Sequence, residues 1–219
     1  MSCTITFAGQ QVEMQPEGVL WFPELRLLCA ADIHFEKGTF FQRFATFLPP
    51  YDTRATLARL AEIIARLQPD RFIALGDSFH DRHAVSRMQP EDKEFLRTLI
   101  GSVRDWIWVQ GNHDPEIALD IPGSRTEEYQ HGNIRFRHEL EQESADWEIS
   151  GHYHPKARVS VRGHGISGPC FLRMGNRLIL PSFGSYTGGL DIFSREFRAI
   201  APSEPRSIYL VHQSRVYAV

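Results

Sequence analysis

The chain has 219 residues, of which 42% are hydrophobic and 23% charged, and its formal net charge is −3 at pH 7. This composition excludes a disordered chain, and the net charge excludes a protein that binds polyanions through overall positive charge. The length suits a single domain, residues 1–219, that buries its core without crosslinks.

Cysteine usage and the absence of targeting signals predict a cytoplasmic protein. The cysteines are odd in number and lie far apart, which fits neither a disulfide framework nor a C-x-x-C site. The chain has no basic start followed by an apolar stretch, and no apolar run of about 18 residues that could span a membrane. We therefore expect no association with a membrane.

In chain order, apolar strand-like runs each end at a cluster of polar, glycine and histidine residues. Two helices are predicted between these runs: the first is capped by Asp52 or Thr53 and ends before Pro69, and the second follows Pro90 and ends before Gly101. The runs and their clusters are Leu25–Ala31 before Asp32-Ile33-His34, Arg71–Leu75 before Gly76-Asp77, Trp106–Val109 before Gly111-Asn112-His113-Asp114, and Trp147–Ser150 before Gly151-His152-Tyr153-His154.

The two halves of the chain have different patterns. The first half reads as β-α-β-α-β, whereas after about residue 130 short strands alternate with Gly and Pro and no helix is predicted as far as Val219. The predicted fold class is therefore mixed α/β with an antiparallel, hairpin-rich second half. In open α/β sheets, ligands gather at the carboxyl ends of the strands, so the clusters can converge in one crevice.

The clusters combine carboxylates, imidazoles and an amide oxygen. Each cluster alone is most simply a hydrogen-bonded loop, but their repetition after successive strands favours a metal site. This donor set suits Mn²⁺, Fe or Zn²⁺ and is too rich in histidine for a Ca²⁺ cage. The number of donors matches a pair of ions bridged by a carboxylate, which needs about seven protein ligands.

The ordered clusters resemble the signature of the calcineurin-like metallophosphoesterase superfamily. The resemblance implies a four-layer αββα sandwich of two mixed β-sheets. It also implies two divalent metal ions, Mn²⁺ foremost with Fe or Zn²⁺ as alternatives, and in-line attack on phosphorus by a metal-bound hydroxide. By the same resemblance Asp77 bridges the metals, His113 is a catalytic histidine that binds no metal, and the other ligands are Asp32, His34 and His154 for one ion and Asn112, His138 and His152 for the other.

Two histidines compete for one ligand position in this scheme. His138 ends the strand-like run Asn133–Arg137, as the other ligands end theirs, whereas His131 lies beside Gly132 and reads as part of a turn. We therefore prefer His138 and keep His131 as the alternative.

The partner of His113 is a second open point. Many phosphatases of the superfamily carry, three residues after the bridging aspartate, another aspartate that pairs with the catalytic histidine. This chain has His80 at that position and Asp81 one residue later. Asp81 and Asp114 are both candidates for the group that orients His113.

A narrower resemblance, over nearly the whole chain, is to the bacterial DNA-ligase-associated phosphoesterases, which are DNA repair endonucleases encoded beside a ligase and a helicase. It implies DNA or another phosphodiester as substrate, with a DNA ligase and a helicase as partners; a homo-oligomer is also compatible with the sequence. The segments that carry this resemblance are Asp32–Lys37, Leu48–Pro50, Gly76–His80, His152–Pro155 and Leu180–Gly189.

Three functional hypotheses follow. The leading one is a metal-dependent phosphodiesterase or nuclease that acts on DNA in repair, supported by a basic run without Asp or Glu that follows the last cluster. The alternatives are a small-molecule phosphatase or cyclic-nucleotide phosphodiesterase, and a non-catalytic scaffold like the retromer subunit of the superfamily, which would not need the complete ligand set. The basic residues are Lys156, Arg158, Arg162, Arg173 and Arg177.

Overall fold

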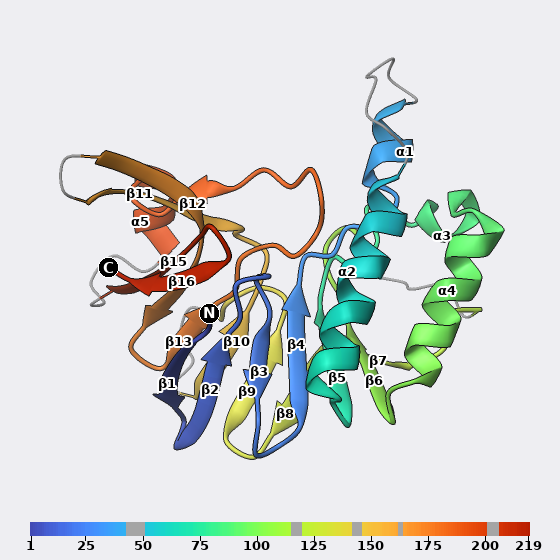
Figure 1. Cartoon of the computed structure of the whole chain (residues 1–219), viewed down its shortest axis with the longest axis horizontal. Helices are drawn as coiled ribbons and strands as arrows, with labels where there is room; N and C mark the ends of the chain where they lie inside the picture. Colours follow the sequence, from blue (N-terminus) through green and yellow to red (C-terminus); the bar gives the residue numbers. More distant parts are fainter. Residues whose placement is uncertain (43–50, 115–119, 142–145, 162–163, 201–205) are drawn as a thin grey trace.

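Two β-sheets stacked face to face form the centre of the molecule (Figure 1). The computed structural model describes residues 1–42, 51–114, 120–141, 146–161, 164–200 and 206–219. The predicted loop Leu48–Pro50 and the basic residue Arg162 lie outside the described residues.

Among the described residues, the first sheet has seven strands that follow one another in chain order. Its first four strands pair antiparallel and the last four pair parallel, so the sheet is mixed. The prediction for Arg71–Leu75 is confirmed, and the strands on either side of it are confirmed within two residues. The strands are β1 Cys3–Phe7, β2 Gln10–Met14, β3 Leu20–Phe22, β4 Leu27–Ala31, β5 Arg71–Leu75, β6 Asp105–Val109 and β7 Ser124–Thr126.

Two long helices, α2 Asp52–Leu67 and α4 Pro90–Gly101, cover the outer face of this sheet. Both helices are confirmed, and both bury an apolar stripe at helical spacing. The predicted cap of α2 is wrong, because Asp52 and Thr53 lie within the helix and their side chains bond to Gly38 and Glu36. The short helices α1 Lys37–Gln42 and α3 Ala84–Arg87 were not predicted. They have too few turns to produce a readable apolar period.

Over the part of the chain that the structure describes, the second sheet has nine strands and is less regular than predicted. Hairpins are frequent, but β9, β10 and β13 pair parallel, which corrects the expectation of an antiparallel second half. The strands are β8 Glu128–His131, β9 Ile134–Arg137, β10 Trp147–Ser150, β11 Pro155–Val161, β12 His164–Met174, β13 Arg177–Ile179, β14 Leu190–Asp191, β15 Arg206–His212 and β16 Arg215–Ala218.

A short helix, α5 Arg195–Ile200, lies on the outer face of the second sheet. The expectation that no helix follows residue 130 is therefore wrong. The helix is anchored by fully buried Phe197, which packs with Leu172 and Met174 of β12. A six-residue helix held by one aromatic side chain gives no periodic signal in the sequence.

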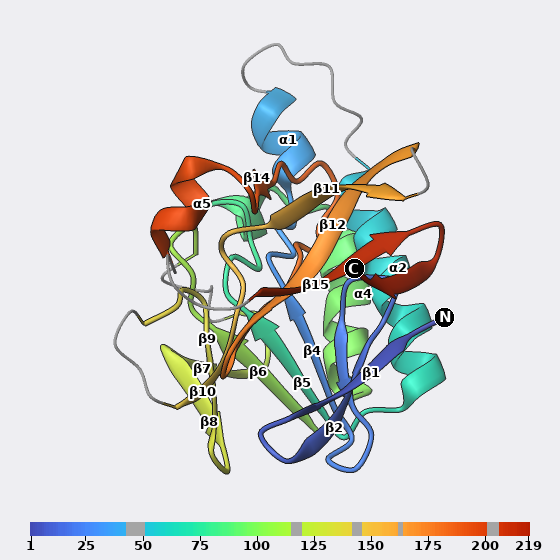
Figure 2. The same ribbon diagram turned by 90° about the vertical axis from the view of Figure 1, so that its left-hand side faces the viewer.

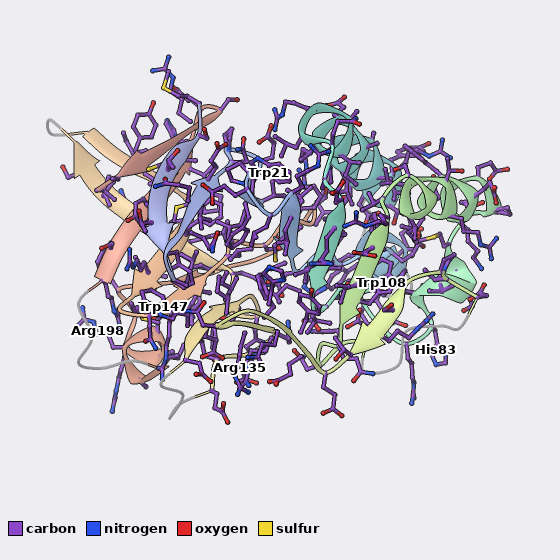
Figure 3. The ribbon with its side chains drawn as sticks, turned by 90° about the horizontal axis from the view of Figure 1, so that it is seen from below. Trp21, His83, Trp108, Arg135, Trp147 and Arg198 are labelled. Carbon is purple, nitrogen blue, oxygen red and sulfur yellow. The ribbon has the colours of Figure 1, made fainter. Side chains whose placement is uncertain are left out.

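Three apolar clusters separate four layers, as the αββα sandwich requires. The first lies between the helices and the first sheet and contains Trp108, and the second fills the space between the sheets (Figure 3). Across that space Trp147 of the second sheet meets Phe7 of the first, with ring centroids 4.9 Å apart. The third cluster lies under α5.

The layers place several strand ends at one edge of the sandwich. Strands β4, β5 and β6 run parallel, and α1 lies beyond their carboxyl ends (Figure 2). The end of β9 reaches the same edge, because His138 contacts the carbonyl oxygen of Leu75 at 3.3 Å. Among the described residues, no helix is long and apolar enough to cross a membrane.

Candidate active site

The loops that leave these strands have an unusual backbone. Positive φ angles, which side-chain-bearing residues adopt rarely, occur at several of the predicted ligands. Such residues cost about 1–3 kcal/mol each unless the surroundings hold them, and they cluster at functional sites. They are Asp32 (53°), His34 (50°), Asp77 (45°), His152 (68°) and His154 (45°).

Glycines in three of the clusters allow the side chains to approach one another. A Cβ atom at Gly76 would lie 2.2 Å from Nδ1 of His138, and one at Gly111 would lie 2.2 Å from Oδ1 of Asp77. At Gly151 the added atom would lie 2.6 Å from a carboxylate oxygen of Asp32. Each glycine therefore keeps open the space that a ligand side chain occupies.

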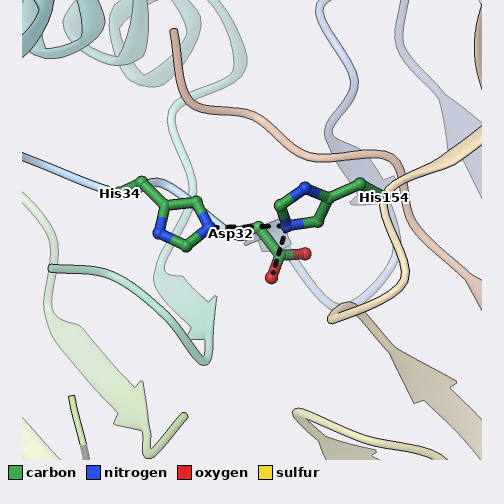
Figure 4. Close-up of side chains that lie close together, drawn as sticks. All are labelled: Asp32, His34 and His154. Carbon is green, nitrogen blue, oxygen red and sulfur yellow. Dashed lines mark hydrogen bonds and ion pairs between the residues drawn. The ribbon is translucent and has the colours of Figure 1, made fainter. Parts of the chain in front are cut away.

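The first group of candidate ligands consists of Asp32, His34 and His154 (Figure 4). Nε2 of His154 lies 3.2 Å from Oδ1 of Asp32 and 3.4 Å from Nε2 of His34. Asp32 and His34 are buried, while His154 is half-buried and borders the solvent. The three side chains thus direct one donor atom each toward a common point.

The second group consists of Asp77, His138 and His152, and Asn112 joins it. Nε2 of His138 lies 3.3 Å from Oδ2 of Asp77, 2.9 Å from Oδ1 of Asn112 and 3.2 Å from Nδ1 of His152. The two groups are neighbours, since Nδ1 of His138 is 3.9 Å from Oδ1 of Asp32. The structure therefore brings all of the predicted metal ligands together.

The electrostatics of the two groups fit divalent cations. Burial lowers the pKa of His138, but the carboxylates of Asp77 and Asp32 outweigh it and raise that pKa to about 9. The negative potential that holds a proton there favours a metal ion in the same place. Burial lowers the pKa of His34 to about 2, which keeps this imidazole in the neutral form that a metal requires. The nitrogen and oxygen donors suit Mn²⁺, Fe or Zn²⁺.

Surrounding groups orient the candidate ligands. Nδ1 of His138 faces the carbonyl oxygen of Leu75, which leaves Nε2 for the centre. The backbone N–H of His113 donates to Oδ1 of Asp77 at 2.9 Å, and that of His152 donates to the Asp32 carboxylate at 3.0 Å. These contacts hold both carboxylates in place.

His131, the alternative ligand, lies elsewhere. It is the last residue of β8 and not part of a turn, and its Nδ1 is 3.5 Å from the guanidinium of Arg71. Arg71 begins β5, so His131 lies at the amino end of a strand whose carboxyl end carries the cluster. The structure thus brings His138, and not His131, to the site.

His113 is exposed beside both groups, and its ring is oriented by the backbone of His80. Nδ1 of His113 lies 3.0 Å from the carbonyl oxygen of His80, and the two rings stack with centroids 5.3 Å apart. Neither predicted carboxylate contacts this ring. The expected choice between Asp81 and Asp114 is therefore replaced by a backbone carbonyl, for which a sequence carries no signal.

The two aspartates have other partners. Asp81 forms an ion pair with Arg87 at 2.5 Å. Asp114 accepts hydrogen bonds from the backbone N–H groups of Phe79 at 2.9 Å and Gly111 at 3.1 Å, so it joins two of the ligand loops. Burial raises the pKa of Asp114 to about 7 despite these hydrogen bonds.

The segment 180–190 also contributes to the site, through its backbone and one hydroxyl group. Ser182 Oγ donates to the carbonyl oxygen of Asp32 at 2.9 Å, and the N–H of Gly184 donates to the same oxygen at 3.0 Å. The subgroup resemblance carried by Leu180–Gly189 was the sequence signal for this segment, but it did not indicate which residues the segment would contact.

Comparisons with known proteins agree with this geometry. The family model described as calcineurin-like phosphoesterase matches residues 25–168, a range that contains both ligand groups. No curated protein matches the sequence significantly. The crystal structure of the Pseudomonas putida nuclease MPE is similar with a TM-score of 0.77 and 25% sequence identity, over 100% of each chain. The E. coli phosphoesterase YfcE gives a TM-score of 0.43 at 15% identity, over 88% of this chain and 97% of that one.

Proposed function

The chain belongs to the calcineurin-like phosphoesterase family and is a metal-dependent phosphoester hydrolase, and from this premise we propose that it cleaves phosphodiester bonds of DNA. The observation that carries the proposal is the convergence of two Asp/His groups at one edge of the sandwich. The family has a dinuclear metal centre, and each group can hold one ion.

Two features favour a polymeric diester over a small monoester. The site lies at the rim of the sheets, where Asn112 and His113 are exposed and His152 and His154 are partly exposed, so a strand can reach it from solvent. In addition, the similar Pseudomonas putida protein, which matches this chain over its full length, is a nuclease.

The side chains have distinct roles in this proposal. Two bound divalent cations would activate water and neutralise charge that develops on the phosphate. Because a carbonyl oxygen can only accept, Nδ1 of His113 keeps its proton toward His80, and Nε2 is the nitrogen left for the substrate. In its protonated form His113 can donate Nε2–H to the leaving oxygen. The residues proposed to hold the cations are Asp32, His34, Asp77, Asn112, His138, His152 and His154.

Mn²⁺ is the proposed ion, and DNA repair beside a ligase and a helicase in the cytoplasm is the proposed setting. The donor set supports Mn²⁺ along with Fe and Zn²⁺. The setting rests on the resemblance to DNA-ligase-associated phosphoesterases.

The test compares three substrates after the metals are removed and Mn²⁺ is restored. These are bis-p-nitrophenyl phosphate, p-nitrophenyl phosphate and a labelled DNA. Asp77→Asn and His113→Ala are the site variants. His83→Ala is the matched histidine control, since His83 is exposed and lies at the edge of the molecule (Figure 3). Asp120→Asn is the matched carboxylate control, because Asp120 is exposed.

We expect Mn²⁺-dependent cleavage of the diester and of DNA by the wild type and both controls. The site variants should lose on the order of 1000-fold in kcat/KM. Cleavage of the monoester alone would replace the proposal with a small-molecule phosphatase. A loss in His83→Ala as large as that in His113→Ala would contradict the role given to His113.

A further inference from the structure

A cavity of about 490 Å³ opens beside His154, the most solvent-facing ligand of the first group. It is bounded by α2, by the loop between β2 and β3, and by the segment 180–190. Its volume is in the range of sites for small ligands. The lining residues that matter for the argument are Glu17, Arg59, His154, Lys156, Ser182 and Thr187.

One wall of this cavity is fixed to both ends of the first ligand group. At one end, the N–H of Phe183 donates to the carbonyl oxygen of Ala31 at 2.8 Å, and Gly184 is bound to Asp32 as described above. At the other end, the N–H of Leu190 donates to the carbonyl oxygen of His154 at 3.2 Å. The cavity therefore keeps a set position relative to the candidate metal centre.

Two cationic side chains enter the cavity from different elements. Lys156 on β11 is exposed, its alkyl stem lies against Gly189, and the described part of the chain gives its ammonium group no ion-pair or hydrogen-bond partner. Arg59 on α2 is held over the ring of Phe183, 4.2 Å from the centroid, and its buried Nε has no hydrogen-bond partner in the described structure.

The described lining has one acidic residue, Glu17, which pairs with Arg66 at 2.8 Å and also attracts Arg59. Lys156 and Arg59 outnumber this carboxylate, so the lining keeps a net positive charge beside His154. Such a site attracts an anion of the size of a phosphate group.

The other described residues of the basic run do not line this cavity. Arg173 donates to the carbonyl oxygen of Thr6 at 3.2 Å and lies over the ring of Phe7, away from the ligand groups. Arg177 is buried beside Glu148 at 4.0 Å. Arg158 is exposed on β11 with Lys156 but is not part of the cavity lining. Only one member of the run, Lys156, therefore reaches the cavity among the described residues.

We propose that this cavity binds the phosphate group adjacent to the scissile phosphate, held by Lys156 and Arg59. The inference rests on the proposed phosphodiesterase function and specifies its substrate: a nucleotide chain that carries a second phosphate next to the one that is cleaved. A single-phosphate diester leaves the cavity without an anion, so the cavity confers a preference for nucleic acid.

The test uses three dinucleotides: TpT, which has one phosphate, and pTpT and TpTp, which carry an added terminal phosphate on the 5′ or the 3′ side. Initial rates with Mn²⁺ give kcat/KM for the wild type, Lys156→Ala and the matched control Arg158→Ala. We expect one of the added phosphates to raise kcat/KM about 10-fold in the wild type and in Arg158→Ala. In Lys156→Ala this gain should fall to about 2-fold or less, mainly through KM.

The outcomes separate this inference from the function on which it rests. If the wild type cleaves none of the three dinucleotides and no DNA, the phosphodiesterase proposal fails. If it cleaves all three at equal kcat/KM, or if Lys156→Ala keeps the full gain, diester cleavage stands and the cavity proposal is overturned. Circular dichroism melting of each variant shows whether an altered rate reflects unfolding, and Lys156→Arg should keep the gain because it keeps the charge.

Discussion

The two ends of strands β4, β5 and β6 differ in the ion-pair partners of their carboxylates. At their amino ends, acidic residues are partly exposed and paired with arginine, as in Arg26–Asp70 at 3.2 Å and Arg71–Asp105 at 2.9 Å. At their carboxyl ends, Asp32 and Asp77 are 0% and 3% exposed, and their ion-pair partners in the described structure are histidines alone. At the amino ends, arginine side chains neutralise the carboxylates. At the carboxyl ends, the buried carboxylates have only histidine partners among the described residues, and this arrangement favours binding of a cation.

Cavity volume alone would have placed the functional site at the amino ends of the strands, and not at the carboxyl ends where the ligand groups lie. A cavity of about 820 Å³ lies at the amino ends of β5 and β6, where Arg71, Arg104 and Trp106 line it. Its charged residues already form ion pairs, with Asp105 contacting both arginines. The smaller cavity beside His154 contains an unpaired Lys156 and borders a ligand group. Unneutralised charge, and not volume, therefore marks the functional edge.

Removal of a carboxylate from each end gives the largest expected contrast. Asp77→Asn should remove the part of the stabilisation by Mn²⁺ that comes from the second group, because this group loses its carboxylate while the first group keeps Asp32. In the wild type and in Asp105→Asn, Mn²⁺ at 100 times its dissociation constant should raise the free energy of unfolding by about 2.7 kcal/mol for each ion bound. Thermal melting with Mn²⁺ and with EDTA measures the difference. Equal stabilisation of Asp77→Asn and Asp105→Asn would erase the distinction between the two ends.

Substitution of His138 at the carboxyl end and of His131 at the amino end compares the two ends a second time. His138→Ala should reduce bound Mn²⁺ from two ions per chain to one, since it removes a donor from the second group. Activity should fall about 100-fold or more. His131→Ala, at the amino end beside Arg71, should keep both ions and its activity. Elemental analysis of dialysed protein counts the metal. If His131→Ala lost an ion and His138→Ala did not, the metal ligand would be His131 and not His138.

These contrasts also show what a sequence can and cannot reveal. The strand runs before Asp32, Asp77 and Asn112 and the two long helices were predictable, because each is a short apolar run or a helical period in consecutive residues. The convergence of the clusters followed from the rule that carboxyl ends of parallel strands meet at one edge.

The remaining features depend on contacts between distant elements. The carbonyl oxygen of His80 orients His113, but a backbone atom is present at every position and gives no signal. Arg59 reaches the cavity beside His154 only because α2 packs against the segment 180–190, which lies more than a hundred residues later. The short helix α5 depends on a single anchor, Phe197, and has no periodicity to detect.

Substitution of two glycines by alanine tests how tightly the carboxyl edge is packed. A Cβ at Gly151 would meet Asp32 Oδ2 at 2.6 Å and Ala31 at 2.7 Å, whereas one at Gly101, beside the amino-end cavity, meets nothing within 4 Å. Gly151→Ala should lower the free energy of unfolding by about 1–3 kcal/mol through overpacking. Gly101→Ala should raise it by about 0.5–1 kcal/mol by restricting the unfolded chain. Urea denaturation measures both. Two changes of the same sign would show that the carboxyl edge can relax.

The smallest effect is expected for the ion pair between Arg71 and Asp105. Their side chains are 23% and 38% exposed, so solvent screens their attraction. A double-mutant cycle with Arg71→Ala and Asp105→Ala should give a coupling free energy of about 1 kcal/mol or less, and less still at high salt. The cycle is needed because Arg71 also lies near Tyr129 and His131, and the single variants include those losses. Phosphoesterase activity should stay at the wild-type level throughout. A coupling several times larger, together with lost activity, would mean that the amino ends contribute to the site and that neutralised charge does not mark an inert region.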